Sequence, residues 1–179
     1  MLLNKNALRR AAVALALPPL LAACTATPSP SPSASFTPTP TPTVTAPKLS
    51  PAEQTVVKLW AVVDRLTNDP SASLQDLDTV ASGHALDFFR KNLTGYRLEK
   101  LTGSGSSVVE LQSAQASGNN TQGLPTWTVT ACIDTSNTKL VDTSGKNVTA
   151  PPYRFQHRSV VVERSAGLYV GQDEVLGTC

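Results

Sequence analysis

Between residues 50 and 95, apolar residues recur every three or four positions, which is the spacing of one face of an α-helix. The first such segment carries Val56, Leu59, Trp60, Val63 and Leu66. Ser50, Pro51 and Glu53 form its start signal, because serine and glutamate can make a capping box and proline suits the first helical position. The run Asn68-Asp69-Pro70 predicts its end.

Two shorter helices are predicted after this one. Ser73 can cap a short amphipathic helix that carries Leu74, Leu77, Val80 and Ala81 and stops at Gly83. A third helix is predicted from His84 to about Leu93, and Gly95 suits its end.

Beyond Gly95 the period changes from helical to alternating, and β-branched residues become common. Residues 126–133 alternate between threonine or cysteine and the apolar Trp127, Val129, Ala131 and Ile133, which predicts a half-buried strand. Further strands are predicted at 108–111, at 139–141 as a continuation of the previous strand, at 153–163 and from 168 onward, with a turn at 103–105. Helices followed by strands predict an α+β domain with one antiparallel sheet.

Residues 1–23 have the pattern of an export signal. Lys5, Arg9 and Arg10 precede an apolar run at 11–21 that is too short to span a bilayer as a helix, and two alanines follow. The junction LLAAC, residues 20–24, resembles the lipobox of bacterial lipoproteins. The resemblance implies cleavage before Cys24, lipid attachment to Cys24, and a chain held at the cell membrane facing outside the cytoplasm.

Residues 24–49 comprise Cys24 and a linker made mainly of proline, serine and threonine, with Lys48 as its one charged residue. Such a composition has little to bury, and its Thr-Pro alternation favours an extended polyproline conformation. We interpret it as a stalk or passive tether between the membrane and a globular domain at 50–179.

The net charge of the chain limits the classes of partner that it can bind. Three of the 15 basic residues lie in the leader. The remaining chain has 12 basic and 13 acidic residues and is therefore close to neutral. This argues against nucleic-acid binding, which needs a clustered basic surface.

Cys132 and Cys179 make an even pair in an exported domain and predict a disulfide. No zinc-type spacing of cysteine and histidine occurs, and no metal or cofactor is predicted.

The order of elements resembles the nuclear transport factor 2-like fold, in which three N-terminal helices pack on a curved antiparallel sheet to form a cone. The segment WTVTACIDTSNTKLVDTSGKNV, residues 127–148, is similar to a pattern of small actinobacterial envelope lipoproteins with that fold. Arg154 or Arg158 and Cys179 fit the same pattern. The fold hosts isomerases, dehydratases, transport adaptors and assembly proteins, so the resemblance does not select a function.

For each residue that could take part in catalysis or ligand binding, we favour a structural interpretation. His84 lies near a helix start and His157 lies within a strand, on a face that the sequence does not decide. Asp134 and Asp142 each begin a sequence that is typical of turns, although Asp134 could serve as a base at the mouth of a cone. Trp60 and Trp127 lie on apolar faces and are interpreted as core residues, with ligand stacking as the alternative.

The sequence therefore favours a non-enzymatic envelope module that binds an envelope protein, a wall component or a small apolar ligand. The alternatives are a small isomerase- or dehydratase-like enzyme and a component of an envelope assembly such as a conjugation or secretion machine. No catalytic residue is assigned.

Lipidation at Cys24 can be tested directly. We expect Cys24→Ala to block processing and to release or mislocalise the protein, because acyl chains on this cysteine would supply the membrane affinity. Detergent-phase partitioning of the variant against the unaltered chain measures this. Unchanged partitioning would show that Cys24 is not the anchor.

Overall fold

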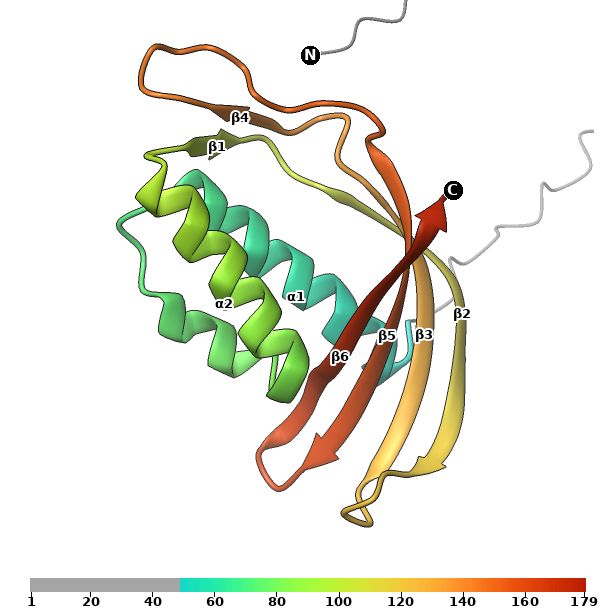
Figure 1. Cartoon of the computed structure of the whole chain (residues 1–179). Coiled ribbons are helices and arrows are strands. Elements are labelled where there is room, and N and C mark those ends of the chain that lie inside the picture. The colour runs from blue at the N-terminus through green and yellow to red at the C-terminus, as the bar shows by residue number, and fades with distance from the viewer. Residues whose placement is uncertain (1–48) are drawn as a thin grey trace, which may run out of the picture. The chain divides into compact units, whose positions relative to one another are not determined.

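The computed structural model describes residues 49–179 (Figure 1). The predicted signal segment, Cys24 and nearly all of the linker lie outside the described residues. None of the helices within 49–179 combines the length and apolar character needed to cross a bilayer.

Helix α1 spans Pro51–Asn68, and its predicted capping box is confirmed. Glu53 N donates to Ser50 Oγ over 3.3 Å, and Ser50 N donates to the Glu53 carboxylate over 2.7 Å. These two bonds satisfy backbone donors that the first helical turn leaves without partners. The face predicted to be apolar is the buried one, with Val56 and Leu59 fully inaccessible to solvent.

The next two elements differ from the sequence prediction in type and length. Leu74–Thr79 forms a short 3-10 helix, η1, capped by Ser73. Helix α2 spans Gly83–Leu98, so the predicted end at Gly95 is wrong. A Cβ at Gly95 would meet nothing within 4 Å, so no close contact requires a glycine there. In the extra turn, the Arg97 guanidinium donates to the Ala72 carbonyl over 2.7 Å.

Four strands form an antiparallel sheet in the order β2-β3-β5-β6. Their bounds are Val108–Asn119 for β2, Pro125–Asp134 for β3, Arg154–Arg164 for β5 and Gly167–Thr178 for β6. The sheet curves, and α1 and α2 lie on the same side of it (Figure 1). Strand β2 is irregular at two places, where Gln112 and Ser117 have no partner residue on β3.

The prediction of a nuclear transport factor 2-like cone, with three helices on one curved sheet, is wrong. Residues 49–179 contain two α-helices and η1, and their six strands form two sheets rather than one. The second sheet pairs β1, Thr102–Ser104, with β4, Lys139–Val141. Strand β4 therefore does not continue β3, because the turn after Asp134 redirects the chain. Residue 103 was predicted in a turn, but it lies in β1 against α1, where a Cβ would come within 2.6 Å of Thr67.

The helical half joins the sheet through Val170 on β6. Ser82 N donates to Val170 O, and Val170 N donates to Val80 O, each over 2.9 Å. The next residue, Gly171, is a bulge, because Val160 pairs with Gln172 while Val161 pairs with Val170. A bulge shifts the alternation of side chains by one position, so residues beyond Gly171 change face.

A disulfide joins Cys132 on β3 to Cys179, with the Cα atoms 6.1 Å apart. The disulfide lies on the sheet face opposite the helices. On that face a guanidinium nitrogen of Arg154 donates to Cys132 Sγ over 3.5 Å. The bond links β3 to the residue that follows β6, across the intervening strand β5.

We expect removal of this disulfide to lower the free energy of unfolding by about 2–4 kcal/mol, because the unfolded chain loses a constraint between residues 47 positions apart. Urea unfolding of a Cys132→Ala/Cys179→Ala variant measures the loss. Reduction of the unaltered protein should reproduce it and should leave the variant unaffected. Equal stability of the oxidised protein and the variant would contradict the prediction.

Candidate functional site

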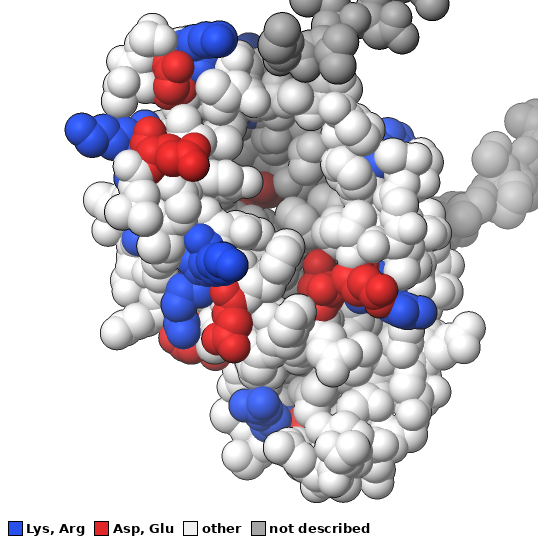
Figure 2. Space-filling view, viewed as in Figure 1, with Lys and Arg blue, Asp and Glu red and all other residues white. Residues whose placement is uncertain are grey.

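A cavity of about 340 Å³ opens between the C-terminal halves of the two helices and the small β1–β4 sheet. Figure 2 shows the corresponding hollow in this face of the molecule, with acidic atoms at its bottom. Its apolar wall consists of Trp60, Val63, Tyr96, Leu140 and Val148. Asp64 is the one acidic residue among those that line it. The volume lies at the lower end of the range of small-molecule sites.

Helical periodicity places the polar residues of α1 at this cavity. Trp60, Asp64 and Asn68 are four residues apart and therefore lie along one face of the helix. Asp64 accepts from Ser107 N over 2.7 Å and from Ser107 Oγ over 2.8 Å. Asn68 donates to Gly105 O over 2.7 Å. These bonds hold the loop between β1 and β2 against α1.

That loop separates the first cavity from a second one of about 580 Å³. Trp60, Asp64, Asn68 and Ser107 line both, so the same side chains form the partition. The rest of the second cavity is lined by other residues of α1, by Asp69, by Gly105 and Ser106 of the loop, and by Val109.

The threonine hydroxyls of the first cavity are engaged in local hydrogen bonds. Thr67 donates to Val63 O, Thr135 to Tyr153 O and Thr138 to Thr135 O, over 2.8–2.9 Å. Thr149 Oγ1 accepts from Leu140 N over 2.7 Å. The hydroxyls of Thr135, Thr138 and Thr149 thus stabilise the loop that borders the cavity. The aromatic and aliphatic groups, Asp64 and Lys139 remain available to a ligand.

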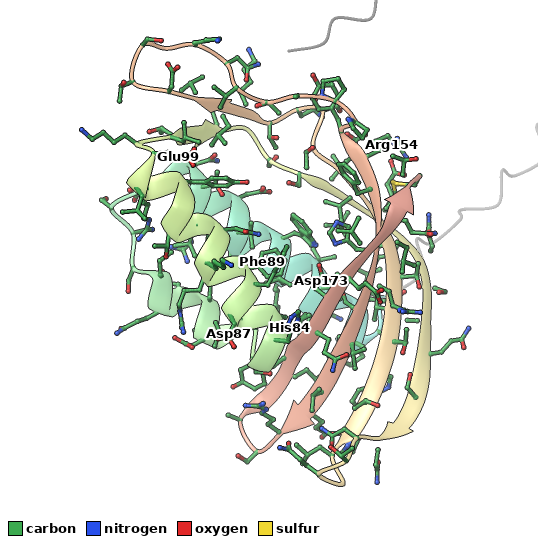
Figure 3. The ribbon with its side chains drawn as sticks, viewed as in Figure 1. His84, Asp87, Phe89, Glu99, Arg154 and Asp173 are labelled. Carbon is green, nitrogen blue, oxygen red and sulfur yellow. A yellow bond between two sulfur atoms is a disulfide. The ribbon has the colours of Figure 1, made fainter. Side chains whose placement is uncertain are left out.

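A polar cluster lies buried between the sheet and the helices. Asp173 on β6 accepts from His157 Nδ1 over 2.8 Å and from Ser159 Oγ over 2.6 Å, both on β5. A carboxylate in its ionised form only accepts hydrogen bonds, and in that form Nδ1 is the donor. The Asp173 side chain is 1% exposed and that of His157 is 7% exposed. Figure 3 shows Asp173 on the side of β6 that faces Phe89 of α2.

Sequence reasoning missed Asp173 because the bulge at Gly171 reverses the alternation along β6. Leu168 and Val170 face the helices, and strict alternation would have turned residue 173 outward. The glycine within a strand pattern was the available signal of a bulge. Sequence reasoning also missed Asp64, because its place in the site depends on hydrogen bonds from Ser107, which is distant in the sequence.

Trp60 lies between the cavity and the polar cluster. Its ring packs edge-to-face on His157, with centroids 5.1 Å apart, and on Phe89, with centroids 5.6 Å apart. Its indole Nε1 is buried and has no hydrogen-bond partner among residues 49–179. Trp60 is therefore both a core residue and a wall of the cavity, whereas Trp127 packs on the core alone.

Asp134 and Asp142 form turns, as the favoured interpretation predicted, and neither lines the cavity. The hydrogen bond from Ser136 and the nearby Arg154 lower the pKa of Asp134. Hydrogen bonds from Ser144 and Lys146 lower the pKa of Asp142. A lowered pKa stabilises the charged form and makes each group a weaker base.

The remaining candidates lie apart from the cavity. His84 is exposed near the start of α2, and Figure 3 places it at the opposite end of that helix from Glu99. Arg154 binds Glu110 over 2.6 Å and Asp134 over 3.3 Å, and Arg158 binds Glu174 over 2.5 Å. Within residues 49–179, no three His, Cys, Asp or Glu side chains gather in a way that could hold a metal ion.

Comparison with known proteins does not assign a family. No protein-family model matches the chain, and no sequence relative is found among curated proteins. Among solved structures, the intermembrane space region of the chloroplast protein ARC6 is similar, with a TM-score of 0.48 and 17% sequence identity. The match covers 74% of this chain and 100% of that one. A likeness at this level carries no functional argument.

The buried cluster should be important for stability. We expect Asp173→Ala to lower the free energy of unfolding by about 3 kcal/mol, because it leaves the donors of His157 and Ser159 buried without an acceptor. Ser159→Ala removes one donor and should cost only about 1 kcal/mol. Urea unfolding of both variants measures this. Equal losses for the two would show that Asp173 does not depend on both partners.

Proposed function

We propose that the chain is a membrane-anchored envelope lipoprotein whose domain binds a small, largely apolar ligand in the cavity beside Trp60. The observation that carries this proposal is the cavity itself, an opening of about 340 Å³ with aromatic and aliphatic walls on a small domain. The lipobox-like segment before Cys24 supports the anchored, extracytoplasmic location.

The chemistry of the lining favours binding over catalysis. Among the residues that line the cavity there is one carboxylate, Asp64, and no histidine. Both oxygens of Asp64 accept from Ser107, and the His157–Asp173 pair lies behind Trp60. An isomerase- or dehydratase-like reaction would need an acid and a base within reach of one substrate. The lining offers a single carboxylate and no histidine for such a pair.

A test uses the full chain in phosphatidylglycerol vesicles, with Trp127→Phe so that Trp60 is the one tryptophan left of two. The probe is 3,3-dimethylbutan-1-ol, a compact neutral alcohol, and Trp60 fluorescence reports binding. We expect Val148→Phe to weaken binding about fivefold or more, because it places extra volume in the cavity.

Val175→Phe is the matched control for this experiment. Val148 and Val175 are 41% and 48% exposed, but only Val148 lines the cavity. The control should bind the alcohol as the unaltered chain does. The proposal is wrong if the alcohol leaves Trp60 fluorescence unchanged, or if both variants weaken binding equally.

A further inference from the structure

Two aromatic side chains from different helices border the cavity. Trp60 comes from α1 and Tyr96 from α2, and Tyr96 is 37% exposed. Trp60 makes ring contacts with Phe89 and His157, while no ring contact joins it to Tyr96 within the part of the chain that the structure describes. Each of the two residues therefore presents surface to the cavity rather than to the other. Aromatic faces carry negative potential and attract cations.

The carboxylate of Asp64 completes this arrangement. Each of its oxygens accepts one hydrogen bond from Ser107, and a carboxylate offers about four acceptor positions. No arginine, lysine or histidine pairs with Asp64 among residues 49–179. Its negative charge is therefore held in place, half-buried in a cavity wall, without a counterion from those residues.

The other ionised group of the lining is Lys139, which is exposed. Water screens an exposed ammonium more strongly than a half-buried carboxylate. The inner part of the cavity therefore favours positive charge. Val63 and Leu140 supply apolar surface beside it.

We propose that the ligand carries an ammonium or quaternary ammonium group on a small apolar body. This inference rests on the proposed binding function and specifies its ligand class. The cation meets the Asp64 carboxylate and the faces of Trp60 and Tyr96, and the apolar body meets the aliphatic wall. An anionic ligand of the same size would be repelled by Asp64.

The test compares choline with 3,3-dimethylbutan-1-ol, in which a carbon replaces the charged nitrogen and the shape stays the same. Phosphatidylglycerol vesicles contain no choline headgroup, so the full chain can be titrated in them with Trp60 fluorescence as the readout. We expect choline to bind about tenfold more tightly than the alcohol. Asp64→Asn should remove that preference, measured as the ratio of the two dissociation constants.

A control variant separates the charge of Asp64 from a general loss of negative charge. Asp87→Asn removes an exposed carboxylate of α2 that does not line the cavity, and it should keep the preference for choline. Circular dichroism checks that each variant is folded.

Tyr96 provides a second route if Asp64→Asn fails to fold. Tyr96→Leu should reduce the preference for choline about threefold, whereas Tyr96→Phe keeps the aromatic face and should retain it. Equal affinity for choline and the alcohol, a preference that survives Asp64→Asn, or a preference that Tyr96→Leu leaves undiminished would overturn the cation inference alone. If neither probe binds, the proposed function fails together with it.

Discussion

The pairing of Val170 with Val80 and Ser82 is the constraint on which the arrangement of this domain depends. Two backbone hydrogen bonds of 2.9 Å attach the segment between η1 and α2 to the edge of β6. This attachment fixes where α2 starts, and with it the position of the helix over the sheet. The bulge at Gly171 follows immediately and turns Asp173 toward the helices. The position of α2 and the buried polar cluster both depend on these few residues.

The buried cluster shows how the domain includes polar groups in its core. Asp173 accepts hydrogen bonds from two side chains of the neighbouring strand, and a buried carboxylate without partners would be strongly unfavourable. Trp60 packs on His157 and covers the cluster from the helix side. The same ring then forms a wall of the cavity, so the core and the candidate site share one residue. A substitution at Trp60 would disturb both.

Features determined by nearby residues could be predicted from the sequence. The capping box of α1 needs only Ser50 and Glu53, and the buried face of that helix follows from spacing alone. A strand at 139–141 was predicted, but its pairing with β1 was not, because that pairing joins distant parts of the chain and three-residue strands carry no periodic signal. The cone-shaped fold was wrongly predicted for this reason. For the site, Trp60 was named as a candidate for ligand stacking, but the roles of Asp64 and Tyr96 depend on loops that fold over them.

The irregular pairing of β2 has a consequence for how the outer strand of this sheet meets other chains. An outer strand of 12 residues exposes backbone groups that could pair with another chain and begin aggregation. Gln112 and Ser117 interrupt the regular ladder at two points along that strand. A second strand would have to match both interruptions to dock along its full length. The edge is therefore a poor template for sheet extension by a strand of another chain.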